Sequence, residues 1–312
     1  IANDGWRDGA ENHGNHAEVD EGAWSARRDA AIQAWFEWLP VRGEPGGGKT
    51  RIFRELRWGD LVNLIMLDTR FYGRDPQPDI AQTDGTREGI LALLNRGKRR
   101  LLGRRQERWL RKRLRSRETT WQAIGQQVLL CPLNTPDLEP LLDFEKPSML
   151  PKETLQQYVG LSKTNPPLLL DTWNGYPWAR RKFLRDVKRY GRNTVVLSGD
   201  MHTALAGNVP LDEAGETITV EFMTPSVTSP GFTEYLPERQ PGVVGEAMLR
   251  QNPDLQYIET SRRGWLCMTF KHDECIGEWH KLDTITRPDY QVTVDKRLSV
   301  TAGNVAAGLR EA

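Results

Sequence analysis

One short segment places an aspartate and a histidine directly after an apolar strand pattern. Residues 195–197 are apolar, and Gly199, Asp200 and His202 follow them within five positions. Side chains at the carboxyl end of a central strand point into the crevice where α/β enzymes bind ligands. Carboxylate oxygen and imidazole nitrogen together suit divalent and transition metal ions, and Gly199 allows close approach to the backbone. The structural alternative is that Asp200 caps a turn and that His202 is buried.

A second segment repeats this arrangement. The apolar run 168–170 ends at Asp171, and Trp173 and Tyr176 follow around a glycine. The beginning of the chain adds a dense group of oxygen ligands that includes Asn3. The sequence therefore offers three groups of polar side chains for one site.

The glycine-rich stretch 43–50 reads GEPGGGKT and fits the P-loop pattern of nucleotide hydrolases. Asp68, at the end of an apolar strand pattern, could then help to hold magnesium. A P-loop needs a strand before it and a helix after it. Here a helical pattern ending near Pro40 precedes it, and the alternating stretch 51–57 follows it. We interpret 43–50 as a surface loop and keep the P-loop hydrolase, with Lys49 as its phosphate ligand, as an alternative.

Positive charge is concentrated between residues 87 and 117. This stretch holds 13 Lys and Arg against two Glu, although the net charge of the chain is only +1. A non-enzymatic module that binds polyanions through this surface is a second alternative. The spacing of Leu102, Leu110 and Leu114, with Trp109 beside them, predicts a helix with one packed face. We therefore expect the charges to form its solvated face.

Three further residues could ligate a soft metal, namely His272, Cys275 and His280. Their spacing is not that of a zinc site, so we interpret them as ordinary strand residues.

The elements that must position these groups follow from hydrophobic periodicity. We expect helices over 26–38, 101–115 and 177–190, and strands over 51–58, 61–67, 121–131, 194–197, 220–223, 265–270 and 276–282. Residues 132–167 are expected to form a long irregular excursion. Helices and strands alternate early in the chain and strands follow one another late, which predicts a layered α/β fold.

Composition excludes several classes of protein. The chain has 312 residues, of which 38% are apolar and 27% charged, which is typical of a globular domain and not of a disordered or collagen-like chain. No apolar run approaches the roughly 20 residues that a membrane span needs. Three cysteines imply no disulfide framework and leave the compartment open.

Ordered segments along nearly the whole chain resemble the PhoD-like alkaline phosphatases of the metallophosphatase superfamily. They are ANDGW (2–6), GAENH (9–13), EWLPVR (37–42), RIFRELRWGDL (51–61), LIMLDTR (64–70), LLGRRQERWLRKRL (101–114), WQAIGQQV (121–128), DTWNGYP (171–177), NTVVLSGDMH (193–202), VEFMTPSVTSPG (220–231), NPDLQY (252–257) and RGW (263–265). Many segments in the right order are more specific than any one of them.

The resemblance implies a four-layer α/β/β/α sandwich of the calcineurin-like type, with residues 1–312 as one catalytic domain. It implies iron and calcium as cofactors and hydrolysis of phosphate mono- and diesters by a metal-bound water or oxide. Asp200 and His202 then become catalytic metal ligands and Asn3 a third ligand. Asp171, Trp173 and Tyr176 are expected to line the substrate site.

Other expectations also follow from the resemblance. The substrate is a phosphate ester, nucleic acid would bind only as a phosphodiester substrate, and no protein partner is implied. A periplasmic or secreted location is expected, although the chain itself carries no signal peptide. The family's Asp-Asp-His-Glu motif would lie just before Ile1, so we expect an N-terminally truncated catalytic domain that on its own binds metal weakly.

Overall fold

The computed structural model describes residues 22–41, 51–212 and 215–312. The helices in these ranges are α1 (Trp24–Trp38), α2 (Arg87–Asn95), α3 (Gly103–Leu114), α4 (Lys152–Ser162), α5 (Pro177–Tyr190), α6 (Phe232–Tyr235) and α7 (Val243–Gln251). The strands are β1 (Arg54–Trp58), β2 (Val62–Met66), β3 (Trp121–Gly125), β4 (Thr194–Ser198), β5 (Ala204–Pro210), β6 (Thr217–Met223), β7 (Leu255–Glu259), β8 (Gly264–Phe270), β9 (Glu274–Leu282), β10 (Val292–Thr301) and β11 (Arg310–Glu311).

The strands form two sheets. The first has seven strands in the order β1-β2-β3-β4-β6-β5-β7, and the second has four in the order β11-β10-β9-β8. Neighbouring strands run parallel from β2 through β3 and β4 to β6, whereas β1, β5 and β7 pair antiparallel with their neighbours. The carboxyl ends of four adjacent strands therefore lie at one edge of the first sheet.

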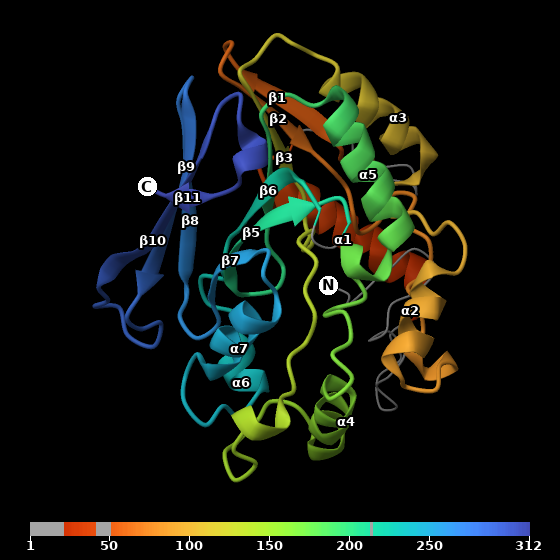
Figure 1. Ribbon diagram of the computed structural model, residues 1–312, viewed down its shortest axis with the longest axis vertical. Coiled ribbons are helices and arrows are strands. Elements are labelled where there is room, and N and C mark those ends of the chain that lie inside the picture. The colour runs from red at the N-terminus through yellow and green to blue at the C-terminus, as the bar shows by residue number, and fades with distance from the viewer. Residues whose placement is uncertain (1–21, 42–50, 213–214) are drawn as a thin grey trace.

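Helices and sheets lie in layers (Figure 1). Helices α3 and α5 cover one face of the seven-stranded sheet, and the four-stranded sheet lies against its other face. This arrangement confirms the predicted mixed α/β sandwich, and the described residues supply three of its four expected layers. Among the described helices, none is long and apolar enough to span a lipid bilayer.

Two hydrophobic cores separate the layers. Leu110 and Leu114 of α3 pack with Phe183 and Leu184 of α5 between the helices and the first sheet. Aromatic side chains fill the space between the sheets, where Trp279 lies 5.9 Å from Phe222 and 4.9 Å from Tyr257 between ring centroids. Aromatic side chains bury a large apolar area each. These cores fix the strands whose ends carry the site.

A buried cluster of charges also joins the sheets. Lys281 of β9 is only 1% exposed and forms ion pairs with Glu259 of β7 at 2.7 Å and with Asp295 of β10 at 2.8 Å. Burial alone would raise the pKa of Glu259, but Lys281 and the Ser261 hydroxyl lower it more, to about 2. Burial lowers the pKa of Lys281, and its two carboxylate partners oppose that change.

Several element predictions need correction. The predicted strand 121–131 ends at Gly125. After it, the Gln126 side chain binds the carbonyl of Val128 in its own segment, and the Gln127 side chain binds the carbonyl of Leu67 after β2. The excursion 132–167 contains the helix α4, which has a polar exposed side. Helices α2 and α7 and strands β5, β7 and β10 were not expected from the sequence pattern.

Candidate active site at the carboxyl edge of the seven-stranded sheet

The loops that follow β2, β3 and β4 meet at one edge of the sheet. Gln127, after β3, joins them: its side-chain oxygen accepts hydrogen bonds from the Thr69 amide and hydroxyl, both at 2.7 Å. Its backbone oxygen accepts from the Gly199 amide at 3.3 Å. Because the three strands are parallel neighbours, these loops lie together at the same edge of the sheet.

Two of the predicted site residues meet across an arginine. The guanidinium of Arg70, in the loop after β2, donates to Asp171 at 2.7 Å and to Asp200 at 2.8 Å. One planar group thus brings together Asp171 and Asp200, which lie 101 and 130 residues after Arg70 in the chain. The Asp200 side chain is 40% exposed, whereas that of Asp171 is 13% exposed. Asp200 is therefore the more accessible of the two carboxylates, and Asp171 is the more buried.

Two buried carboxylates hold these loops in place. Asp68 accepts hydrogen bonds from the backbone amides of residues 70–72 and so fixes the loop that presents Arg70. Glu221 of β6 accepts from the Ser198 hydroxyl at 2.7 Å and from the amides of residues 130–131. Burial raises the pKa of both carboxyls, and the hydrogen bonds that they accept partly oppose it.

His202 is oriented by a backbone carbonyl. Its Nδ1 lies 2.6 Å from the carbonyl oxygen of Pro230. A carbonyl oxygen can only accept a hydrogen bond, so Nδ1 carries the proton and donates. In the neutral ring, Nε2 then keeps its lone pair. Metal-binding histidines usually donate their other ring N–H in this way, which fixes the tautomer and the ring orientation.

The segment that contains Pro230 packs closely against Arg263 and the backbone of His202. A Cβ on Gly231 would lie 3.3 Å from the His202 carbonyl oxygen and 3.3 Å from the Arg263 guanidinium. Arg263 is 5% exposed and forms an ion pair with Glu234. Gly231 therefore permits the close approach that places the Pro230 carbonyl at His202.

The backbone at the site is strained. Asp200 has φ 72° and His202 has φ 56°, both in the left-handed region that residues with a side chain rarely adopt. Such conformations cost about 1–3 kcal/mol each, persist only where the surroundings impose them, and cluster at functional sites.

Two other predicted site residues, Trp173 and Tyr176, are buried. Trp173 is 1% exposed and donates to the Gln126 side chain at 3.1 Å. Tyr176 is fully buried, and its hydroxyl donates to the Asp75 carbonyl at 2.8 Å. Both therefore support the Asp171 loop from within the core and do not reach an open surface. Asn3 lies outside the described residues, as does the glycine-rich stretch 43–50.

The chain after residue 50 forms β1, antiparallel to β2, where a P-loop would need a helix. This order of elements argues against the P-loop alternative.

Sequence reasoning missed three residues at this edge. Arg70 carries the central positive charge, Gln127 joins the loops, and Arg263 supports the Pro230 segment. The only signal for Arg70 was its position directly after an apolar strand that ends in aspartate. Nothing in the local sequence pattern indicated Gln127 or Arg263, because their partners lie far away in the chain.

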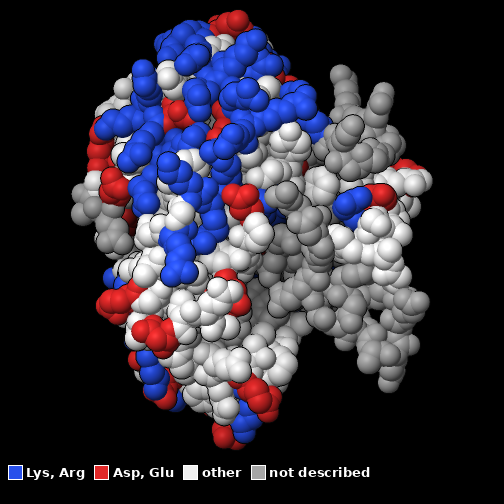
Figure 2. Space-filling model, turned by 90° about the vertical axis from the view of Figure 1, so that its right-hand side faces the viewer, with Lys and Arg blue, Asp and Glu red and all other residues white. Residues whose placement is uncertain are grey.

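The basic stretch forms one side of a larger charged face. Figure 2 shows Lys and Arg gathered over the side of the molecule on which α3 and α5 lie. Leu102, Leu110 and Leu114 are buried as predicted, and Trp109 is half-buried. Of the arginines expected to be exposed, Arg104, Arg108 and Arg115 are exposed, whereas Arg111 is half-buried and pairs with Asp186 at 3.2 Å.

Comparisons with known proteins give a consistent result. The model of the PhoD-like phosphatase family matches residues 1–279. Alkaline phosphatase D of Bacillus subtilis (strain 168) is 28% identical over 295 residues, which are 93% of this chain and 44% of that protein. A solved structure described as "Structure of PhoD" superposes with a TM-score of 0.69 at 24% identity and covers 94% of this chain and 51% of that chain. The chain spans about half the length of the relatives that it matches.

Proposed function

Because the chain belongs to the PhoD-like phosphatase family, we propose that it is the part of a metal-dependent phosphoester hydrolase that carries Asp200 and His202. The observation that carries this proposal is the orientation of His202. Its Nδ1 is held by the Pro230 carbonyl, which in the neutral ring leaves Nε2 with its lone pair, and the partly exposed carboxylate of Asp200 lies two residues before it in the chain.

The residues present fit a metal ion. Asp200 supplies a hard oxygen ligand and His202 a nitrogen ligand, a combination that suits iron and other transition metals. We propose Asn3 as a further ligand and iron with calcium as the ions, both from the family resemblance. Bound metal would neutralise phosphate charge and lower the pKa of water for attack on phosphorus.

Arg70 provides the second element of the proposal. In the structure its guanidinium is shared by Asp171 and Asp200. When a metal ion takes Asp200, we expect one N–H of Arg70 to turn towards a phosphate oxygen, since guanidinium groups bind phosphates in a planar, bidentate manner. Asp171 would keep the other side of the guanidinium in place. The substrate is therefore proposed to be a phosphate mono- or diester.

Metal analysis tests this assignment. We expect purified protein to bind iron and calcium in equilibrium dialysis, and His202→Ala and Asp200→Asn to bind at least tenfold less at equal ion concentration. His272→Gln, which changes an exposed histidine away from this edge, is the matched control and should retain the ions. Equal metal content in all variants would contradict the assignment.

The basic face supports a second candidate function. Arg104, Arg105, Arg108 and Lys112 of α3 are exposed, and Arg185, Lys188 and Arg189 add to them from α5. Such a surface can bind a polyanion with strong salt dependence. Binding that falls steeply with salt, without any hydrolysis, would favour this candidate over the phosphatase. A periplasmic or secreted location remains a further proposal from the family resemblance.

A further inference from the structure

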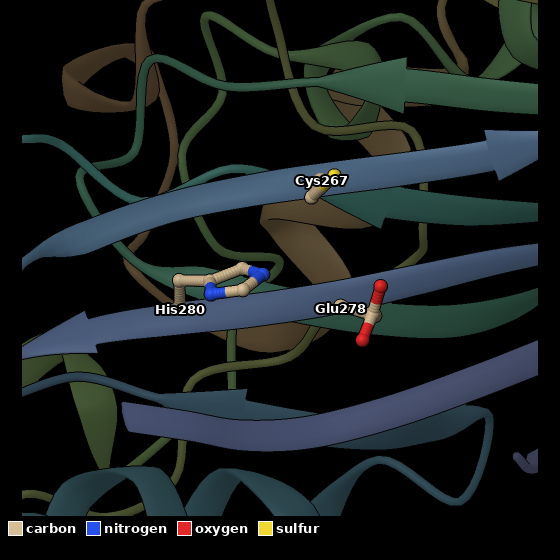
Figure 3. A group of neighbouring side chains, drawn as sticks. All are labelled: Cys267, Glu278 and His280. Carbon is tan, nitrogen blue, oxygen red and sulfur yellow. The ribbon is translucent and has the colours of Figure 1, made fainter. Parts of the chain in front are cut away.

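Three side chains with metal-binding atoms meet on the four-stranded sheet, away from Asp200 and His202. Cys267 of β8 lies directly opposite Glu278 of β9, and His280 lies two residues further along β9. Alternate residues of a strand share a face, and Cys267 and Glu278 share one because they are a cross-strand pair. The Cys267 sulfur, a Glu278 oxygen and a His280 nitrogen lie within 4.8 Å of one another, as Figure 3 shows.

This face is the one that points away from the core. Trp279, which lies between Glu278 and His280, is fully buried on the opposite face of β9, as is Cys275, whereas Cys267 is exposed. The grouping of His272, Cys275 and His280 considered from the sequence therefore does not form. Cys275 is on the buried face, and His280 is instead paired with Cys267 and Glu278.

Neighbouring residues hold two of the three ligands in position. The His280 ring stacks on Trp265, its direct partner on β8, with ring centroids 5.2 Å apart and planes within 3° of each other. Arg297 of β10 donates to Glu278 Oε1 at 2.6 Å. A carboxylate has two oxygens, so Oε2 is still available to a cation. The stacked ring likewise presents its nitrogens along the sheet surface and not into the core.

We propose that Cys267, Glu278 and His280 bind a divalent cation of the zinc class, with a fourth position open to solvent. One sulfur, one nitrogen and one oxygen ligand plus a water is a set that zinc accepts in tetrahedral geometry. Bonds of about 2.0–2.3 Å require ligand atoms about 3.3–3.8 Å apart. Because these atoms lie within 4.8 Å of one another, each pair must close by about 1.5 Å at most, which side-chain rotation allows. On binding, the Cys267 thiol loses its proton to solvent and its sulfur binds the cation as thiolate.

Arg297 allows a specific test of the proposed zinc site. Its guanidinium competes with the cation for the charge of Glu278, so Arg297→Gln should bind zinc more tightly than the unchanged protein, by about tenfold. An ordinary cross-strand ion pair with an unrelated cysteine nearby predicts no such gain. The site is independent of the proposed phosphatase function, since it shares no residue with the crevice after β4.

The test uses the single exposed thiol. Cys131 and Cys275 are buried, so a maleimide reagent should react rapidly with Cys267 in the reduced protein. We expect Zn²⁺ to slow this alkylation at least tenfold and EDTA to restore it. Co²⁺ should give a thiolate-to-cobalt charge-transfer band that Cys267→Ser abolishes.

Substitutions in and outside the cluster show whether zinc protects Cys267 from this site. Protection should be lost in His280→Ala and Glu278→Gln and kept in His272→Gln and His202→Ala, which change histidines outside the cluster. The inference is overturned if Zn²⁺ leaves alkylation unchanged, or if it protects Cys267 equally in His280→Ala. It is also overturned if His202→Ala abolishes the protection, because the cation would then act from the other site.

Discussion

The Nδ1 atom of His202 lies 2.6 Å from the carbonyl oxygen of Pro230, 28 residues further along the chain. This hydrogen bond connects the loop after β4 with the segment after β6 and decides which ring nitrogen is free. The proposed metal site therefore depends on a backbone contact as well as on its ligands.

That contact predicts an effect of Gly231 on metal binding. Gly231→Ala adds a Cβ at 3.3 Å from the His202 carbonyl oxygen and the Arg263 guanidinium, so the Pro230 segment must shift by a few tenths of an ångström. We expect about 10–100-fold weaker metal binding, which is the usual effect of losing an outer-shell partner. Titration with iron measures it. Unchanged affinity would show that the Pro230 carbonyl does not orient His202.

The strained backbone at Asp200 predicts that one substitution there removes activity without lowering stability. Asp200→Gly relieves the strain of the left-handed backbone at this position (φ 72°) but removes a half-exposed ion pair with Arg70. Since exposed ion pairs contribute at most about 1 kcal/mol and left-handed strain costs at least as much, its melting temperature should be unchanged or higher. Phosphoesterase activity should nevertheless be lost. A variant that is both unstable and inactive would mean that Asp200 has a structural role.

Arg70 should be sensitive to the shape of its side chain. Arg70→Lys keeps the charge but cannot reach Asp171 and Asp200 together through one planar group. We expect KM for a phosphomonoester to rise about tenfold in Arg70→Lys and further in Arg70→Ala. Steady-state kinetics with inorganic phosphate as a competing ligand checks this. If both variants bind phosphate as well as the unchanged protein, Arg70 only supports the loop.

The packed face of α3 predicts a loss of stability without loss of chemistry. Leu110 is 2% exposed between α3 and the sheet, so Leu110→Ala should lower the free energy of unfolding by about 2–5 kcal/mol. Arg108→Ala, on the exposed side of the same helix, should change it by no more than about 0.5 kcal/mol. Urea denaturation measures both. Similar small effects would mean that this helix packs loosely.

The charge cluster between the sheets predicts acid sensitivity. The folded pKa of Glu259 is about 2, below its ordinary value of 4.5. Its stabilising contribution is therefore complete above about pH 4.5 and is lost as the pH falls towards 2. Glu259→Gln should flatten the dependence of the urea midpoint on pH across this window. Lys281→Met should also destabilise the protein, because Glu259 and Asp295 then keep only the more exposed Arg262 as their cation. The loss should be smaller than the roughly 3–5 kcal/mol that follows when a buried charge loses its only partner.

Sequence patterns predicted the elements whose signals lie within a short stretch of the chain. Helix α5 begins and ends where expected, since Pro177 occupies its first position and Phe183, Leu184 and Val187 define one face. Strand β10 was missed because Asp295, Lys296 and Arg297 interrupt its alternation, and the structure has a bulge there. Strand β5 was missed because Gly207 and Pro210 read as a turn.

The residues of the candidate site also differ in whether a local sequence signal indicates them. The sequence predicts Asp200, His202 and Asp171 as site residues because each follows an apolar strand or run, and the structure brings Asp171 and Asp200 together at Arg70. Trp173 and Tyr176 shared that local signal, yet only the tertiary structure buries them. The Pro230 carbonyl, Gln127 and the cluster of Cys267, Glu278 and His280 depend on contacts between distant segments, which a single sequence does not reveal.

The P-loop alternative makes its own prediction. Lys49 lies outside the described residues, and the strand β1 that follows it does not suit a nucleotide-binding loop. In a full-length version of the protein, Lys49→Ala should therefore leave phosphoester hydrolysis within about twofold, because Lys49 would have no part in the reaction. A loss of two orders of magnitude would restore the P-loop hydrolase.

The central claim is that Asp200 and His202 hold the metal used in phosphoester hydrolysis. Its most direct test is hydrolysis of a chromogenic phosphomonoester and a chromogenic phosphodiester by the purified protein, measured before chelation, after it and after ions are returned. We expect chelation to abolish the activity, iron with calcium to restore it, and Asp200→Asn and His202→Ala to lose at least about 100-fold under restoring conditions. Activity that survives both the chelator and the two substitutions would contradict the claim.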